Sequence, residues 1–263
     1  MIAIDLGGKK AIVCGSSQGI GKATALRLAE AGAEVTLIAR DESKLKEVLK
    51  ELNTSSGQKH SFLIADFAQP LQLKDVIHGY IKEGGTVNIL INNTGGPRAG
   101  DAVNADTSEF MNAFSNHLIC NQILVQATVE SMKSSAYGRI INIISTSVKQ
   151  PLKGLGVSNT IRGAVASWAK TLAGELGPYG ITVNNVLPGA TRTERLYSLF
   201  KTKAESMGKS TDEIEAEWKK EIPAGRFAEP VELANAVAFL ASPLASYING
   251  INLPVDGGRT GCL

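Results

Sequence analysis

Apolar residues along this chain alternate between short runs rich in β-branched side chains and longer segments with a helical period. The short runs predict strands at residues 11–13, 34–38, 61–64, 87–91, 139–143 and 181–186. The longer segments predict helices at residues 20–31, 41–52, 71–81, 108–132, 156–176 and 231–240. Strands that are apolar throughout and separated by helices are typical of an α/β protein with a doubly wound parallel sheet, covered on both faces.

The pattern contains no linker, internal repeat or low-complexity stretch. We therefore predict a single domain over residues 1–263, with a sheet of about seven strands. One stretch differs, because residues 193–223 are charged and amphipathic. We expect this stretch to form a small helical flap over the edge of the sheet. Its apolar side chains are Leu196, Phe200, Ile214 and Trp218.

Composition narrows the possible partners and compartment. The 263 residues are 43% hydrophobic and 20% charged, which suits a soluble globule, and the formal net charge is only +2. This balance gives no basic field for nucleic acid, and no apolar run approaches the roughly 20 residues of a membrane span. The N-terminus leads almost at once into a strand, without the apolar region of a signal peptide. Cys14, Cys120 and Cys262 suit free thiols in a reducing cytoplasm, where we expect the protein to reside.

A glycine-rich turn follows the first predicted strand, where residues 14–21 read CGSSQGIG and lead into a helix. Gly15 permits the tight turn, Gly19 lets the backbone approach a phosphate, and Gly21 allows the helix to pack closely on the strand. A pyrophosphate would bind at the helix N-terminus, where free N–H groups and the dipole favour an anion. The turn therefore predicts a dinucleotide site in a Rossmann-type sheet; the alternative is a turn that serves packing alone. The predicted contacts are Gly15, Ser17, Gln18, Gly19, Ile20 and Gly21.

The residue after the second predicted strand bears on the choice of cofactor. An acidic residue there would hold the ribose hydroxyls, whereas this chain has Arg40, followed by Asp41. Arginine offers bidentate hydrogen bonds to a 2′-phosphate, so NADP(H) is favoured over NAD(H). The alternative is that Arg40 is a solvated turn residue and Asp41 holds the ribose.

Several further motifs occur together with the glycine turn. Asp66 follows the third predicted strand, residues 92–95 (NNTG) follow the fourth, and residues 188–189 (PG) follow the sixth. The tail carries GRFAEP at residues 225–230 and VDGG at residues 255–258. In this combination the chain resembles the short-chain dehydrogenase/reductase family, and in particular its 3-oxoacyl-carrier-protein reductase-like branch, over essentially its whole length. Cys14 and Thr94 depart from the usual threonine and alanine of the family.

The resemblance implies further cofactor contacts. Asp66 would meet the adenine amine, Asn92 the adenine ribose region, and Thr193 the carboxamide of the nicotinamide. The full set of contacts that it adds is Asp66, Phe67, Asn92, Thr94, Gly95, Arg162, Pro188, Gly189, Thr191 and Thr193. We expect no metal ion in this site. The resemblance also implies a homodimer or homotetramer, formed through the helices predicted at residues 108–132 and 156–176.

The resemblance also implies four catalytic positions, of which three differ here. Ser145 matches the serine that orients the carbonyl, but Ser158 stands where the family has its proton-donating tyrosine. Arg162 stands in place of the lysine four residues later, so the i, i+4 spacing keeps both side chains on one helix face. His117 aligns with the asparagine of the long helix, with Asn116 one residue away.

These differences leave two interpretations open. Serine is a poor general acid and arginine cannot shuttle a proton, so His117 is the one group of the set that would titrate near neutrality. Our hypothesis makes His117 the acid/base, directly or through water, with Ser145 and Ser158 as hydroxyl donors. The alternative is that His117 is satisfied by packing or backbone contacts. For Ser158 and Arg162, an altered active site and a decayed one both remain open.

Basic residues also gather on loops expected at the carboxyl ends of the strands. They suggest an anionic substrate, such as a carboxylate, a phosphate or an acyl carrier; the alternative is that they are simply solvated. These residues are Arg98, Lys149, Lys153, Arg192 and Arg195. The sequence thus favours an atypical NADP(H)-dependent oxidoreductase acting on a small carbonyl or secondary alcohol. The alternatives are a catalytically silent module that senses the cofactor or supports an active homologue, and another reaction with tightly held cofactor, such as epimerisation.

Overall fold

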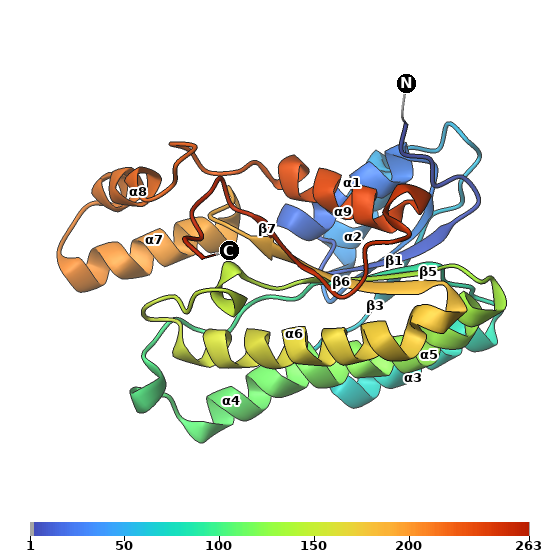
Figure 1. Ribbon diagram of the computed structural model, residues 1–263, viewed down its shortest axis with the longest axis horizontal. Coiled ribbons are helices and arrows are strands. Elements are labelled where there is room, and N and C mark those ends of the chain that lie inside the picture. The colour runs from blue at the N-terminus through green and yellow to red at the C-terminus, as the bar shows by residue number, and fades with distance from the viewer. Residues whose placement is uncertain (1–2, 263) are drawn as a thin grey trace.

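One parallel sheet holds the strands of residues 3–262, the part of the chain that the computed structural model describes (Figure 1). The strands are β1 (Lys10–Cys14), β2 (Glu34–Ala39), β3 (Ser61–Ile64), β4 (Ile89–Asn92), β5 (Gly138–Ile143), β6 (Ile181–Pro188) and β7 (Asn252–Val255). Their order is β3-β2-β1-β4-β5-β6-β7, and every neighbouring pair is parallel. The order reverses between β1 and β4, which is where ligands bind in sheets of this kind. The predicted doubly wound sheet of about seven strands is confirmed.

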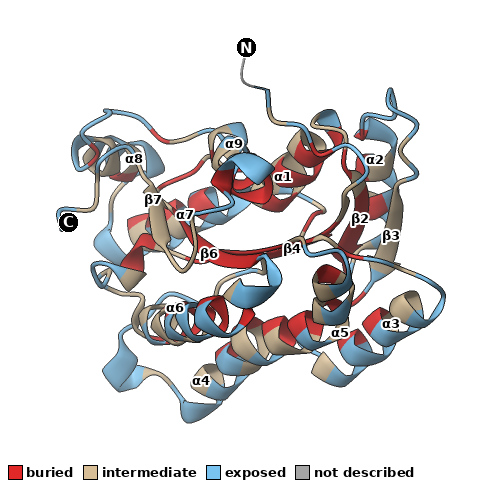
Figure 2. Ribbon diagram, turned by 45° about the vertical axis from the view of Figure 1, so that its right-hand side comes forward, coloured by how far each residue is buried: buried red, intermediate tan, exposed pale blue. Residues whose placement is uncertain are grey.

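Helices cover both faces of this sheet (Figures 1 and 2). One layer consists of α1 (Gly19–Glu30), α2 (Glu42–Glu51) and α9 (Pro230–Ala241). The other consists of α3 (Pro70–Lys82), α4 (Thr107–Phe114), α5 (Cys120–Ser134) and α6 (Gly156–Leu176). Each layer closes its own apolar core, with Leu28 and Val237 on the first side and Ile77 and Leu124 on the second, all fully buried. Because both faces are covered, the central strands are apolar throughout rather than alternating.

The long helix predicted at residues 108–132 is interrupted in the structure. A π-helical turn over Ser115–Ile119 separates α4 from α5. Short 3₁₀ turns occur at Ala102–Asn104, Thr146–Val148, Gly177–Tyr179 and Pro243–Ala245. The strand β7 was not among the predicted ranges. It contains Pro254 and lies half-buried at the edge of the sheet, where proline is tolerated, so it lacks the apolar run of a central strand.

Four asparagines form a ladder of side-chain hydrogen bonds across β4, β5, β6 and β7. Asn92 Nδ2 donates to Asn142 Oδ1 at 2.9 Å, and Asn142 Nδ2 donates to Asn185 Oδ1 at 2.8 Å. Asn185 Nδ2 then donates to Asn252 Oδ1 at 2.8 Å. The four residues are direct partners in the strand register. The ladder therefore gives the Nδ2 groups of Asn92, Asn142 and Asn185 an acceptor each, whereas Asn92 Oδ1 is buried without a partner among the described residues.

Two further helices extend beyond the edge of the sheet, at the left of Figure 1. They are α7 (Glu194–Met207) and α8 (Thr211–Lys220). The four apolar residues that predicted a helical flap all lie in one small cluster between these helices, together with Phe227. The rings of Phe200 and Trp218 meet edge to face at 5.3 Å between centroids. The flap thus has its own apolar anchor, separate from the two cores of the sheet.

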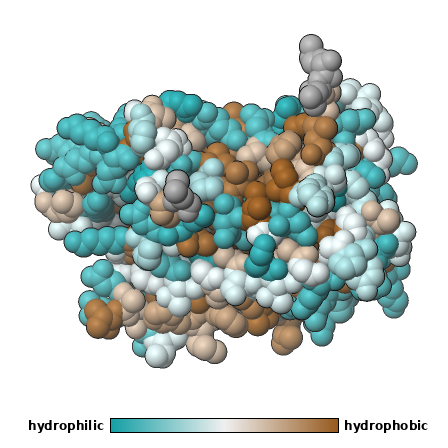
Figure 3. Space-filling model, viewed as in Figure 1, coloured by the Kyte–Doolittle hydropathy of each residue, from teal (hydrophilic) through white to brown (hydrophobic). Residues whose placement is uncertain are grey.

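Exposed apolar side chains gather near α4. Met111 is 70% exposed and Val103, in the preceding turn, is 89% exposed. Figure 3 shows this apolar surface along the lower edge of the view, where α4 lies. None of the helices within residues 3–262 combines the length and apolar character needed to cross a bilayer.

Candidate functional site

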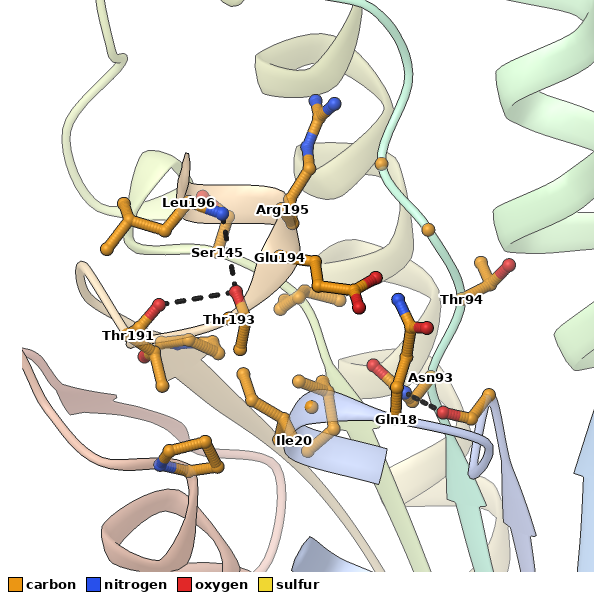
Figure 4. Close-up of a pocket in the computed structure, with 18 of the residues that line it drawn as sticks. Gln18, Ile20, Asn93, Thr94, Ser145, Thr191, Thr193, Glu194, Arg195 and Leu196 are labelled. Carbon is orange, nitrogen blue, oxygen red and sulfur yellow. Dashed lines mark hydrogen bonds between the residues drawn. The ribbon is translucent and has the colours of Figure 1, made fainter. Parts of the chain in front are cut away.

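A cleft of about 1040 Å³ lies at the carboxyl ends of the strands and extends under the first turn of α7 (Figure 4). Its walls come from the loops after β1 to β6, from α6 and from the flap. Most of the predicted site residues meet here, although they are far apart in sequence. Those that line the cleft are Gly15, Ser17, Gln18, Gly19, Ile20, Arg40, Asp66, Phe67, Thr94, Gly95, Ser145, Ser158, Arg162, Pro188, Gly189, Thr191 and Thr193.

The glycine turn has the backbone that the sequence predicts. Gly15 and Gly19 both have φ of +58°, in the left-handed region that favours glycine. Gly21 does not line the cleft, and a side chain there would collide with the carbonyl oxygen of Gly15. Gln18, the N-cap of α1, makes no side-chain cap, and the first turn holds no acidic residue. The helix N-terminus is therefore open to an anion.

Two cations border the end of the cleft beyond β2. Arg40 lines it, and so does Lys44, whose Nζ donates to Gln18 Oε1 at 3.2 Å. The carboxylate of Asp41 is occupied as the cap of α2, where it accepts from Lys44 N at 3.1 Å and from Ser43 Oγ at 2.8 Å. These hydrogen bonds lower the pKa of Asp41. Asp41 also lines the cleft, but its carboxylate is engaged by the helix cap, whereas the side chains of Arg40 and Lys44 are cationic. The arrangement therefore suits a phosphate better than a pair of ribose hydroxyls.

Sequence reasoning did not identify Lys44. Its position could have indicated it, because Lys44 comes three residues after Asp41, the N-cap of α2, and therefore lies in the first turn of that helix beside Arg40 and Asp41.

Besides Gly21, one more predicted cofactor residue lies outside the cleft. Asn92 does not line the cleft; it is 2% exposed and is engaged in the asparagine ladder. Asn93 lines the cleft instead, and its Nδ2 donates to Cys14 O at 3.2 Å and to Gly15 O at 3.3 Å. Successive residues at the end of a strand point to opposite faces, so an NN pair alone does not tell which one faces the ligand.

The loop after β6 joins the cleft to the flap. Thr193 caps α7: its Oγ1 accepts from Leu196 N at 3.4 Å and donates to Thr191 O at 3.2 Å (Figure 4). A side chain added at Gly19 would come within 3.3 Å of Thr193 Cγ2. The start of α7 is therefore held against the glycine turn, and the next residues, Glu194 and Arg195, line the cleft.

The far end of the cleft contains the two serines and Arg162. Ser145 follows β5 and caps the next 3₁₀ turn, where its Oγ accepts from Ser147 N at 3.1 Å. Ser158 and Arg162 both lie on α6, which spans the predicted residues, and both line the cleft as the i, i+4 spacing predicts. Arg162 is 7% exposed and donates to Ile143 O at 3.1 Å. Burial and the charge of Arg195 lower the pKa of Arg162 to about 10, so its guanidinium stays charged at neutral pH.

His117 does not fill the predicted role of an acid/base. Its side chain is 2% exposed and does not line the cleft. Burial and the charge of Arg162 lower the pKa of His117 to about 2, against the opposing effect of a hydrogen bond with the backbone of Gly95. The imidazole is therefore neutral over the physiological pH range. Of the two interpretations of His117, the buried histidine satisfied by packing and backbone contacts fits the structure better than the acid/base.

Asn116 occupies the cleft wall that was assigned to His117. It lines the cleft, and its amide nitrogen, suitably oriented, lies 2.8 Å from Phe67 O and 3.2 Å from Asn112 O. Asn116 and His117 both belong to the π-helical turn over Ser115–Ile119. Such a turn inserts one residue into the helix, so it shifts by one position which side chain faces the cleft. A regular 3.6-residue period cannot reveal this shift.

The predicted ring of loop cations is also only partly present. Arg192 and Arg195 line the cleft, whereas Arg98, Lys149 and Lys153 do not. Arg192 pairs with Glu229 at 2.9 Å. The positions of these residues in the sequence therefore predicted more positive charge at the mouth of the cleft than the structure has there.

Residues 15–260 match the family described as Enoyl-(Acyl carrier protein) reductase. Among curated relatives, the chain is 34% identical to a 3-oxoacyl-(acyl-carrier-protein) reductase of Vibrio cholerae over 257 residues, covering 97% of this chain and 98% of that protein.

Solved structures of reductases also match this chain over nearly its whole length. L-sorbose reductase from Gluconobacter frateurii, solved with NADPH and L-sorbose, is 30% identical and superposes with a TM-score of 0.92 over 100% of both chains. YwfH, an NADPH-dependent reductase involved in bacilysin biosynthesis, is 26% identical, with a TM-score of 0.90 over 97% of this chain and 99% of that one.

Proposed function

This chain belongs to the short-chain dehydrogenase/reductase family of NAD(P)-dependent oxidoreductases that act on carbonyls or alcohols, and on that premise we propose that it is an atypical NADP(H)-dependent member. One observation carries the proposal: the glycine turn, the Arg40 end and Ser145 line a single continuous cleft. A cofactor bound at the turn would extend toward the serine.

The residues present fit a phosphorylated dinucleotide. The positive φ of Gly15 and Gly19 and the open N-terminus of α1 provide backbone N–H groups for the pyrophosphate. Arg40 and Lys44 provide the cations for a 2′-phosphate. Thr193, which the family resemblance assigns to the carboxamide, lies between the turn and the flap. When bound, the nicotinamide supplies or accepts the hydride.

The reacting oxygen would be held by hydroxyl groups and a positive field. Ser145 and Ser158 can each donate a hydrogen bond to a carbonyl oxygen at the far end of the cleft. The buried charge of Arg162 favours negative charge developing on that oxygen. None of these three groups releases a proton near neutral pH, so in this proposal solvent water provides it. The flap, with Leu196 and Leu199 on the wall, would shield the reaction.

The experiment is a spectrophotometric assay of NADPH oxidation against a panel of aldehydes, ketones and oxo acids, with calorimetric titration of NADPH and NADH in parallel. The proposal expects NADPH binding together with turnover of at least one carbonyl. NADPH binding without any turnover would favour the second candidate, a silent cofactor-binding subunit. The specific observation in its favour is that Ser158 and a neutral, buried His117 leave the cleft without a family-type proton donor.

We also propose a homodimer or homotetramer in the cytoplasm. The exposed apolar side chains around α4, Met111 among them, give a surface that a second copy would cover. Size-exclusion chromatography with light scattering tests this, and a monomer at all concentrations would contradict it.

A further inference from the structure

Two guanidinium groups converge on the same point at the far end of the cleft. A Cβ atom added at Gly96 would lie 3.7 Å from Arg162 Nη2 and 3.8 Å from Arg195 Nη2. Arg162 comes from α6 and Arg195 from the first turn of α7, so the flap and the body of the protein each supply one cation. Gly96 has no side chain, which leaves the space between the cations free.

Neither cation has a carboxylate partner among residues 3–262. Arg162 donates to Ile143 O, and Arg195 Nη2 donates to Pro97 O at 2.6 Å. Neither takes part in an ion pair of the described chain. The carboxylate of Glu194 is adjacent in sequence, but Figure 4 shows it pointing toward Gln18, away from the guanidinium of Arg195.

Other arginines of the same region are paired. Arg192, Arg226 and Arg259 pair with Glu229, Glu232 and Glu221, respectively. Placing two like charges together without an acid is unfavourable, and both burial and mutual repulsion act on Arg162. An anion placed between the two guanidiniums would relieve this repulsion and receive bidentate hydrogen bonds.

We propose that Arg162 and Arg195 bind the carboxylate of the substrate, and that the substrate is a small oxo acid or the corresponding hydroxy acid. This rests on the proposed function, because Ser158 would hold the reacting oxygen. Ser158 and Arg162 are one helical turn apart on α6 and line the same cleft, so that one small substrate can meet both the hydroxyl and the guanidinium. Leu155 and Leu199 line the same cleft and would accept an apolar substituent.

The test compares acids with matched neutral compounds. The protein, saturated with NADP⁺ to prevent reduction, is titrated with phenylpyruvate and with methyl phenylpyruvate, and binding is followed by calorimetry. We expect the acid to bind at least about 10-fold more tightly than the ester, and Arg195→Ala to abolish that difference. Arg195→Lys should keep part of it, because the charge stays while the bidentate geometry is lost.

Arg98→Ala is the matched control, because Arg98 is exposed and close in sequence to Pro97 but does not line the cleft. It removes the same charge and should leave the acid-to-ester ratio unchanged. Equal affinity for acid and ester in the unaltered protein would overturn the inference, even if neutral carbonyls are reduced. The inference would also fail if Arg195→Ala weakened NADPH binding while leaving the acid-to-ester ratio intact, since the cations would then serve the cofactor. Failure of NADPH to bind at all would instead refute the proposed function.

Discussion

The two ends of the cleft are built in different ways. At the glycine turn, the binding groups are backbone N–H groups, and their positions follow from where Gly15, Gly19 and Gly21 stand in the sequence. At the far end the binding groups are side chains from the loop after β5, from α6, from the π-helical turn and from the flap, which meet only after folding. The backbone end keeps the family pattern, whereas the side-chain end departs from it at Ser158 and Arg162. Cofactor binding can therefore persist while the chemistry changes.

The strongest way to break the backbone end is Gly21→Ala. The added methyl group collides with the carbonyl of Gly15, so α1 must move away from the turn. We expect NADPH affinity to fall more than about 100-fold, measured by calorimetry, since several backbone hydrogen bonds are lost together. Gly163→Ala is the control, because nothing lies within 4 Å of a Cβ atom there. Unchanged affinity in Gly21→Ala would show that close packing of α1 on the turn is not required.

At the side-chain end, Ser145→Ala removes a hydroxyl donor without touching the glycine turn. If it holds the reacting oxygen, kcat should fall about 100-fold while the Kd for NADPH stays the same. Ser167→Ala, on the exposed side of α6, should change neither quantity. A parallel loss of NADPH affinity would mean that the two ends are not independent.

His117 gives a measurement of stability rather than rate. Its pKa is about 2 in the folded protein and near 6.5 when unfolded, so below pH 6.5 the unfolded state binds more protons. The stability that the neutral histidine contributes is present above pH 6.5 and is lost as the pH falls. At pH 5 the loss relative to pH 7.5 should be about 2 kcal/mol, from the 1.36 kcal/mol per pH unit of linkage.

Urea denaturation at the two pH values measures this loss, and His117→Gln should reduce the pH dependence. His78→Gln, at an exposed position, should leave it unchanged. A pH dependence that is the same in His117→Gln would contradict the depressed pKa.

The smallest expected effect concerns the choice between the two cofactors. Arg40→Ala should weaken NADPH binding about 10-fold and leave NADH binding nearly unchanged, because one charged hydrogen-bonding group to the 2′-phosphate is lost. Lys50→Ala, on the last turn of α2 and away from the cleft, is the control. Equal losses for NADPH and NADH would assign Arg40 to a general role in the turn.

The same contrast explains what the sequence could predict. The sheet and most helix bounds followed from apolar periodicity, because burial on both faces leaves a strong pattern. Three side-chain predictions did not hold: Asn92 belongs to the ladder, His117 is buried, and three of the five loop cations lie outside the cleft. Tertiary packing decides each of these three cases: which asparagine of the NN pair faces the cleft, where a residue is inserted into the helix, and in which direction a loop points. Local sequence carries little information about them.

The asparagine ladder has a consequence for how the sheet can assemble. Its four amides bond only when β4, β5, β6 and β7 stand in one alignment, because each rung joins residues that are direct partners. Sliding one of these strands by two residues would keep the apolar faces matched but separate the buried amides of Asn92, Asn142 and Asn185 from their partners. The row of asparagines thus disfavours sheets with a shifted strand register, which hydrophobic burial alone would not distinguish from the native one.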